Sequence, residues 1–185
     1  MGQYYNAVLK NANGEMHSYY NYGLKLMEHS WFKNPFVNEV CKKLINKPHY
    51  VAWVGDYANN DSEMVDFIIN NCGEQIANKE GFNTLLFVLV NHTKKQYMTM
   101  DGYYNNAIRK FEDDWVIHPL PLLTAKGNGR GGGDYRGANL ENVGIWAEDL
   151  LEFVTYEEME YDYEAKTMVL KEHKDYKEVT FEFYE

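Results

Sequence analysis

The sequence predicts an α+β fold, with a mainly antiparallel, twisted sheet and two or three helices packed against it. Three observations predict it: a hairpin signal at Asn13-Gly14, a helical pattern from Asn34-Pro35, and the apolar run Leu85–Val90 between polar residues. Aromatic residues make up 16% of the chain and include 16 Tyr, a composition that favours strands. The length of 185 residues predicts a single domain over residues 1–185.

The first part of the chain predicts a hairpin followed by a helix. Strand Gln3–Lys10 alternates Tyr and Val, and its expected partner is Glu15–Tyr20. Asn34-Pro35 supplies an N-cap and a first helical residue for an amphipathic helix over about residues 35–46.

A strand and a second helix are expected next. His49–Asp56 is typical of a strand, and Asp61-Ser62 offers a new helix cap. The helix after this cap is expected to bury Met64, Val65, Ile68 and Ile69.

Asn83–Asn91 is predicted to be the central strand, because a short apolar run between polar turns is typical of a strand buried on both faces. The elements expected after it are a turn at HTKK, a strand at QYMTM, a short helix over Tyr103–Phe111, a strand over Trp115–His118, a long loop over 119–142, a strand pattern in VGIWAEDLLEFV, a strand or hairpin over Tyr161–Glu172, and a half-solvated antiparallel strand over 179–184.

The predicted core consists of apolar residues on the inner faces of these elements. They are Val8, Phe36, Val40, Leu44, Val51, Trp53, Ile68, Leu86, Val88, Val90, Trp115 and Ile145.

The cysteines and the apolar segments of the chain indicate where the protein is located. Cys41 and Cys72 lie in no CxxC and near no His at metal spacing, which favours reduced thiols and a cytoplasmic location. The N-terminal residues lack a signal-peptide pattern, and the longest apolar run is too short to span a bilayer, so no membrane association is expected.

Charge is placed unevenly along the chain. Residues 148–185 hold 13 acidic and 4 basic residues, a net of −9 out of −10 for the whole chain. Clustered Lys and Arg are needed to neutralise phosphates, so direct binding of nucleic acid is not expected.

The most unusual motif is GNGRGGGD, residues 127–134. Its glycines allow successive backbone N–H groups to turn toward one anion, and an arginine adds a bidentate donor. An anion or nucleotide site here would use Gly129, Arg130, Gly131, Gly132, Asp134 and the nearby His118. The alternative is a tightly turned structural loop that Arg130 and Asp134 tie to the body, because the motif matches neither phosphate-binding pattern GxxxxGK[ST] nor GxGxxG.

The sequence gives little support for a catalytic site. His29, His92 and His118 would form a metal or acid–base site with Asp56 only if the fold gathered them, and structural histidines are the simpler interpretation. No serine lies in GxSxG, and Cys41 falls on the buried face of its helix. We therefore assign no catalytic residue, no metal and no cofactor, and lean toward a protein that is not an enzyme.

The acidic strand segment 148–185 permits two interpretations. Its carboxylates would solubilise an outer strand and block edge pairing, or they would present an acidic face to a basic protein partner. A nucleic-acid-binding protein is one such partner, because carboxylates imitate phosphate charge. The residues expected to form this face are Glu157, Glu158, Glu160, Tyr161 and Tyr163.

Several segments resemble an uncharacterised family of small bacterial and mobile-element proteins that begin with MGQYY. The matching stretches are MGQYYNAVLK, GLKLMEHSWF, VAWVGDYA, LVNHTKKQY, HPLPLLTAKGNGRGGGDYRG and VGIWAED, which together span about residues 1–149. The resemblance implies one domain and a shared surface near these segments, and it brings no catalytic residue with it.

Three functions stay open at this point. The first is a non-enzymatic binding protein, in one version a mobile-element inhibitor of a host defence protein that acts as anti-CRISPR proteins do. The second is a protein that sequesters or acts on a phosphorylated small molecule or nucleotide through the Gly-rich loop, as a hydrolase or transferase would. The third is a housekeeping or scaffolding domain without a small ligand.

Overall fold

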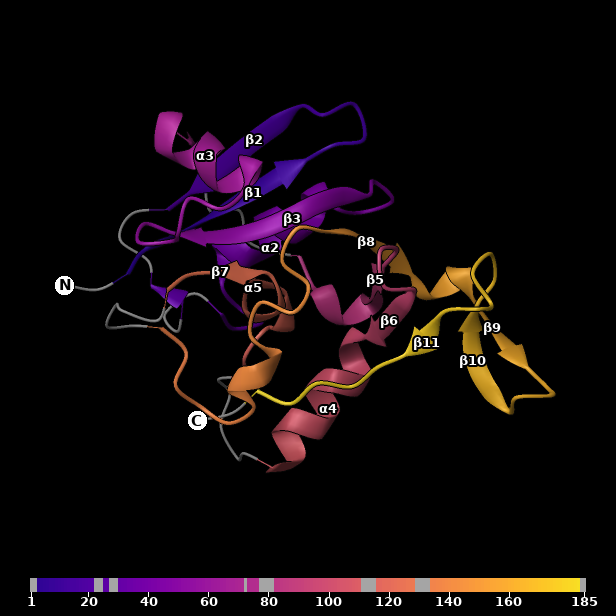
Figure 1. The fold of residues 1–185 in the computed structure, drawn as a ribbon. Helices are drawn as coiled ribbons and strands as arrows, with labels where there is room; N and C mark the ends of the chain where they lie inside the picture. The colour runs from indigo at the N-terminus through magenta and orange to yellow at the C-terminus, as the bar shows by residue number, and fades with distance from the viewer. Residues whose placement is uncertain are drawn as a thin grey trace.

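The computed structural model describes residues 3–21, 25–26, 30–71, 73–76, 82–110, 116–128 and 134–183, without the side chains of 108–110. Within these residues the fold is α+β, built on a nine-stranded sheet that is mainly antiparallel and larger than the sequence suggested (Figure 1). The strands of this sheet are β1 (Tyr5–Lys10), β2 (Met16–Tyr20), β3 (His49–Gly55), β4 (Glu74–Gln75), β5 (Phe87–Asn91), β6 (Gln96–Thr99), β7 (Ala125–Lys126), β8 (Asp149–Thr155) and β11 (Lys177–Glu178).

The strand order is β11-β6-β5-β8-β3-β1-β2-β4, and β7 also pairs with β3. The short strands β4, β7 and β11 pair in parallel, and the others are antiparallel. A separate antiparallel hairpin follows, made of β9 (Met159–Asp162) and β10 (Thr167–Leu170). The described helices are α2 (Pro35–Lys43), α3 (Glu63–Asn70), α4 (Met100–Lys110) and α5 (Pro119–Leu123), with 3₁₀ turns η1 (Thr84–Leu86), η2 (Leu140–Asn142) and η3 (Tyr156–Glu158).

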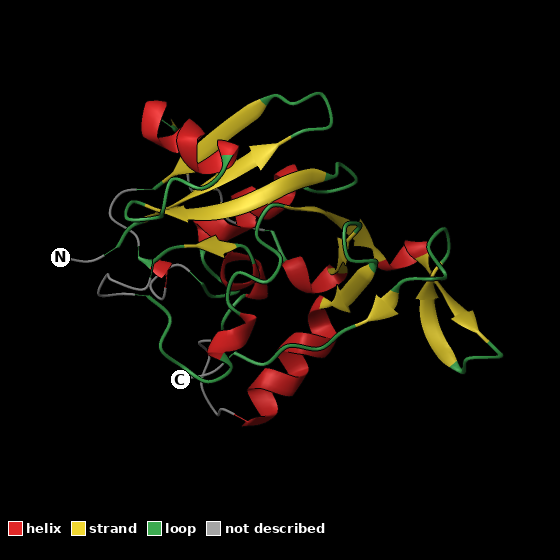
Figure 2. Cartoon of the chain, viewed as in Figure 1, coloured by secondary structure: helices red, strands yellow, loops and turns green. Residues whose placement is uncertain are grey.

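The sheet separates the interior into layers (Figure 2). On one face, α2, α4 and α5 bury the main core against residues such as Leu9, Trp53 and Leu89. On the opposite face, α3 covers β1 and β3, while the β9–β10 hairpin covers Val88 and Val90 of β5. Neighbouring residues of β5 thus point into different layers, as the alternation of a strand requires.

The first strands and helices agree with the sequence prediction. Asn11 accepts hydrogen bonds from the backbone N–H groups of Asn13 and Glu15 at the β1–β2 turn, and Gly14 adopts a φ of +84°. The side chain of Asn34 accepts from the N–H groups of Phe36 and Val37, and thereby caps α2.

Helix α3 begins at its predicted cap, Ser62, which accepts from the N–H of Val65. Its last turn differs from the prediction, because Ile69 is 61% exposed. Met64 and Val65 are the residues that α3 fully buries, and both lie in its first turn. The helix thus docks on the sheet through its beginning, and its end extends toward solvent.

The predicted central strand is shorter than expected. Residues 84–86 form η1, because the Asn83 side chain accepts from the N–H of Leu85 and starts a 3₁₀ turn. Leu86, predicted to be core, is consequently 63% exposed. Strand β5 begins at Phe87 and lies inside the sheet between β6 and β8, but β8 and β3 are the middle strands.

The segment predicted as a long loop begins with a buried helical turn. Pro119 stands at the first position of α5, and the leucines of this helix are fully buried. Lys126 then follows in β7, beside β3. The strand expected just before is reduced to a single bridge between Ile117 and Trp31, and Trp115 lies outside the described residues.

The VGIWAEDLLEFV segment is a strand only from Asp149 onward. The preceding residues turn, with positive φ values at Gly144 and Glu148. The turn directs Trp146 into the core, where it is fully buried, while the predicted core residue Ile145 is partly buried.

The C-terminal segment forms the expected hairpin, but the antiparallel strand predicted over 179–184 is wrong, because the described residues 179–183 are not strand. Only Lys177–Glu178 are strand, and they pair in parallel with β6 because the chain rejoins the sheet at the Lys95 end of that strand. Val179, Phe181 and Phe183 still face the core in alternation.

Most of the predicted core is buried. Ile68 and Ile145 are partly buried, and Leu86 is exposed. The fully buried predictions are Val8, Phe36, Val40, Leu44, Val51, Trp53, Val88 and Val90.

Candidate functional site

The Gly-rich segment is anchored to β1 at its far end. Asp134 Oδ1 accepts hydrogen bonds from the hydroxyl of Tyr5 at 2.6 Å and from Nε2 of Gln3 at 3.2 Å. Burial and the Asp134 carboxylate both raise the pKa of Tyr5. A Cβ at Gly127 would lie 2.3 Å from the Tyr5 hydroxyl, so this glycine permits the near end of the segment to approach the same strand.

These contacts favour the structural interpretation of the segment. The remaining loop residues of the predicted anion site, Gly129, Arg130, Gly131 and Gly132, lie outside the described residues. The anion interpretation thus has only Asp134 and His118 among the described residues, and Asp134 is a carboxylate that would repel a phosphate.

His118 is a helix cap in the interior. Its Nδ1 accepts from the N–H of Leu120 at 3.2 Å at the start of α5, so the ring proton is on Nε2, which lies 3.8 Å from the sulfur of Cys41. Burial lowers the pKa of His118 to about 3 and raises that of the Cys41 thiol. A neutral imidazole beside a protonated thiol gives neither an anion ligand nor an activated nucleophile.

The other catalytic candidates have structural partners. Asp56 accepts from the backbone N–H of Tyr4 at 3.0 Å, and Nε2 of His92 lies 2.8 Å from Oε1 of Glu152. His29 lies outside the described residues. Across the described part of the chain, no group of three or more His, Cys, Asp or Glu side chains is arranged to hold a metal ion.

The acidic segment contains the β9–β10 hairpin, residues 159–170. We name it the terminal hairpin. It projects from the end of the sheet (Figure 1). Its root is fixed, because Met159 and Leu170 are buried against β5 and β6, and the hydroxyl of Tyr97 donates to the carbonyl of Met168 at 2.7 Å. Asp162 accepts from two backbone N–H groups of the turn.

The distal part of the terminal hairpin exposes large apolar side chains. Tyr163 is 85% exposed, Tyr161 48% and Met168 42%. The rings of Tyr161 and Tyr163 meet edge to face with centroids 5.1 Å apart. Both tyrosines thus lie at the surface, and their role in binding stays a prediction.

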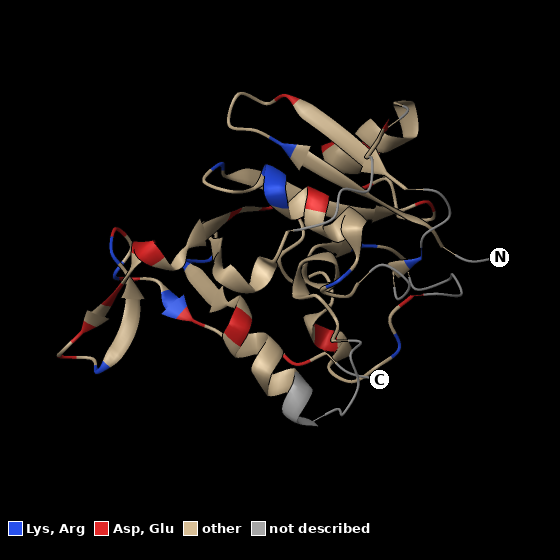
Figure 3. Ribbon diagram, turned by 180° about the vertical axis from the view of Figure 1, so that it is seen from behind, with Lys and Arg blue, Asp and Glu red and all other residues tan. Residues whose placement is uncertain are grey.

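Acidic residues lie along the terminal hairpin and the chain next to its root (Figure 3). Glu157 and Glu158 are exposed in η3, next to the root of the terminal hairpin. Glu160 forms an ion pair with Lys174 over 2.6 Å. The structure thus gathers all five predicted partner-binding residues on η3 and β9 or immediately after them.

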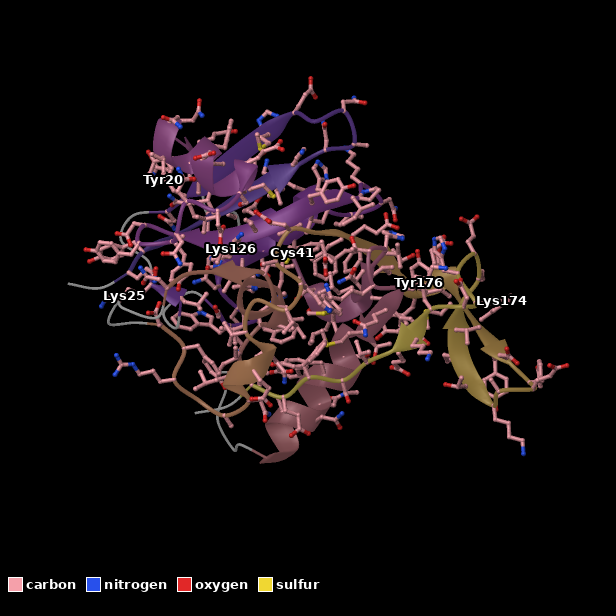
Figure 4. The ribbon with its side chains drawn as sticks, in the orientation of Figure 1. Tyr20, Lys25, Cys41, Lys126, Lys174 and Tyr176 are labelled. Atoms are coloured by element: carbon pink, nitrogen blue, oxygen red, sulfur yellow. The ribbon has the colours of Figure 1, made fainter. Side chains whose placement is uncertain are left out.

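A pocket with a volume of about 180 Å³ lies between β8, η3, β10 and the chain that follows β10. We name it the acidic pocket; its lining consists of Asn46, Val90, Glu152, Val154, Glu158, Leu170, Glu172 and His173. One lining carboxylate, Glu152, contacts Nε2 of His92 at 2.8 Å, and Nδ1 of His92 lies 3.1 Å from the hydroxyl of Tyr176. Figure 4 places Tyr176 at the root of the terminal hairpin.

Among the lining residues, only Val90, as core, and Glu158, as a partner-binding residue, were predicted from the sequence. Glu152 lies in β8 while Glu172 and His173 follow β10, and the register of β5 against β8 brings His92 to Glu152. The only signal in the sequence was the acidic excess after residue 147, which carries no information on how these residues pair.

No protein-family model, curated protein or solved structure matches this chain. Among the residues that the structure describes, no helix has the length and apolar character needed to cross a membrane.

Proposed function

We propose that this protein is a non-enzymatic binding protein that presents its terminal hairpin to a basic protein partner. The observation that supports this proposal is the exposure of Tyr161, Tyr163 and Met168 on a hairpin whose root is buried. Exposed aromatic side chains on a fixed element are typical of the anchors that dominate protein interfaces.

The charge of the segment indicates the kind of partner. Residues 148–185 carry a net charge of −9, and Glu157 and Glu158 are exposed beside the tyrosines. A concentrated field of one sign accelerates encounter with a surface of the opposite sign. The basic surface of a nucleic-acid-binding protein meets this requirement, and an anti-CRISPR-like inhibitor of such a host defence protein is the version we favour.

The structural alternative is that the carboxylates only keep an exposed strand from pairing with other chains. That alternative accounts for charge, but it does not account for three large apolar side chains on the same hairpin. A solubilising hairpin gains nothing from Tyr163, whose ring is almost entirely in water.

The test uses capture followed by direct measurement. A photocrosslinking residue in place of Tyr163 identifies the partner in cells, and the affinity of the purified pair is then measured. We expect a basic partner whose binding is lost in the Tyr161→Ser, Tyr163→Ser double variant. Tyr57→Ser is the matched control, because Tyr57 is also exposed but lies after β3. An affinity that is the same for the double variant and the control would refute the proposal.

A further inference from the structure

We infer that the acidic pocket receives one arginine side chain of the partner. This inference rests on the proposed function and adds to it the chemical group that the partner inserts. Three features of the pocket support it: an apolar floor, an acidic rim and the ring of His173, which stacks on a neighbouring ring.

The floor is apolar and well packed. Val90, Val154 and Leu170 line it, and all three belong to the small core beneath the terminal hairpin. The methylene stem of an arginine or lysine side chain is buried favourably on such a surface while its charged end stays at the rim.

The rim consists of three glutamates, and no Lys or Arg is among the lining residues. Glu158 and Glu172 form no ion pair with any described residue, and Glu152 has only His92 as a partner for its carboxylate. Like charges that line one pocket repel one another, so a bound cation relieves the repulsion. A guanidinium group is suited to several carboxylates at once, because its five N–H donors spread in a plane.

The wall favours arginine over lysine. His173 lines the pocket and stacks on Tyr176, with ring centroids 4.5 Å apart and an interplanar angle of 20°. The ring of His92 meets His173 edge to face at 5.2 Å. A planar guanidinium stacks on such rings, whereas an ammonium group has no plane to match.

The size of the pocket points to a single side chain. Its volume of about 180 Å³ is below the roughly 300–1,000 Å³ of pockets that hold drug-sized ligands. One extended side chain suits a pocket of this size.

The first experiment titrates the full chain with N-acetyl-arginine amide and follows backbone amide signals by NMR. We expect saturable shifts for the residues lining the pocket, weaker binding of N-acetyl-lysine amide, and no binding of N-acetyl-citrulline amide, which keeps the shape but lacks the charge. The Glu158→Gln, Glu172→Gln double variant should weaken arginine binding about tenfold or more. The matched control Glu141→Gln, Glu164→Gln removes the same charge from exposed residues outside the pocket and should bind as wild type does.

The second experiment measures the same two double variants against the purified partner. The inference is supported if the pocket variant loses affinity for the partner and the control variant does not. Unchanged affinity in the pocket variant, with loss in the Tyr161→Ser, Tyr163→Ser variant, overturns the arginine pocket and leaves the proposed function in place. Binding of N-acetyl-arginine amide at the pocket with no dependence of partner affinity on either tyrosine overturns the proposed function instead. Equal binding of the arginine and citrulline probes overturns the inference outright.

Discussion

The hydroxyl of Tyr5 donates a hydrogen bond to Asp134 over 2.6 Å and joins two residues that are 129 positions apart in the chain. Tyr5 is the first residue of β1, and Asp134 is the last residue of the Gly-rich motif. Gln3 contributes a second donor to the same carboxylate oxygen. The Gly-rich segment therefore returns to the body at a point fixed by buried side chains.

Removal of this carboxylate is expected to destabilise the fold. Asp134→Ala leaves the buried Tyr5 hydroxyl without its acceptor, which should lower the free energy of unfolding by about 1–3 kcal/mol. Tyr5→Phe removes the donor as well, so the double variant should lose less than the sum of the two single variants. Urea denaturation of the four proteins provides the measurement.

A panel of nucleotides separates the two interpretations of the Gly-rich motif. If the motif binds a phosphorylated ligand, a panel of nucleotides should raise the thermal midpoint of the wild type, and Arg130→Ala should abolish the increase. We expect no increase for any nucleotide, because the described contacts of Asp134 serve to anchor the loop. A nucleotide-dependent increase that disappears in Arg130→Ala would contradict this expectation.

Features that depend on short-range interactions were predicted better than features that depend on pairing between distant parts of the chain. The α2 cap was predictable because Asn34 bonds within three residues of itself. His118 plays the same part at α5, but histidine is not among the preferred caps, so the buried helix after it was predicted as loop. A short-range signal is thus useful only when the residue type is one that commonly gives it.

Long-range pairing explains the remaining differences. β7 and β11 are two residues each, and each adds in parallel to a strand far away in the sequence, which leaves no period to detect. Likewise, His92 reaches Glu152 only through the register between β5 and β8. The exposed tyrosines could be predicted from composition and alternation, but the acidic pocket could not.

Burial of His118 predicts a dependence of stability on pH. Its pKa is about 3 in the folded protein and near 6.5 when unfolded, so between these values the unfolded state binds more protons. The free energy of unfolding should therefore fall as the pH drops below 6.5, by up to about 1.4 kcal/mol per pH unit from this residue.

The variant His118→Asn tests this prediction, because Asn retains a cap acceptor but does not titrate. Its stability at neutral pH should be lower, since the smaller side chain leaves space beside Phe32 and Cys41. Between pH 7 and 5, however, it should lose about 2 kcal/mol less than the wild type does. Parallel stability curves for the two proteins would show that His118 is protonated in the folded state.

The chain after the terminal hairpin is expected to contribute substantially to stability. Phe183 is 3% exposed and meets the ring of Tyr135 edge to face at 5.6 Å, while Phe181 meets Trp146 at 5.4 Å. Phe183→Ala should lower the free energy of unfolding by about 3 kcal/mol, because it removes a buried ring. Tyr163→Ala is the control and should change it by no more than about 0.5 kcal/mol, because that ring is in water. Chemical denaturation measures both, and equal effects would mean that the last residues do not pack on the core.

The final prediction concerns the rate at which the partner binds. Glu157 and Glu164 are exposed and form no ion pair with any described residue, so Glu157→Lys with Glu164→Lys alters the field around the terminal hairpin but leaves the acidic pocket intact. The association rate should fall and the dissociation rate should change little, because exposed charges mainly steer encounter. The control Glu74→Lys with Glu141→Lys makes the same change in net charge outside the acidic segment and should affect association less.

Added salt should slow association of the wild type and should reduce the difference between the two variants, since the screening length is about 8 Å at physiological ionic strength. Stopped-flow or surface-based kinetics at several salt concentrations measures these rates, and identical salt slopes for both double variants would show that the partner approaches a different face.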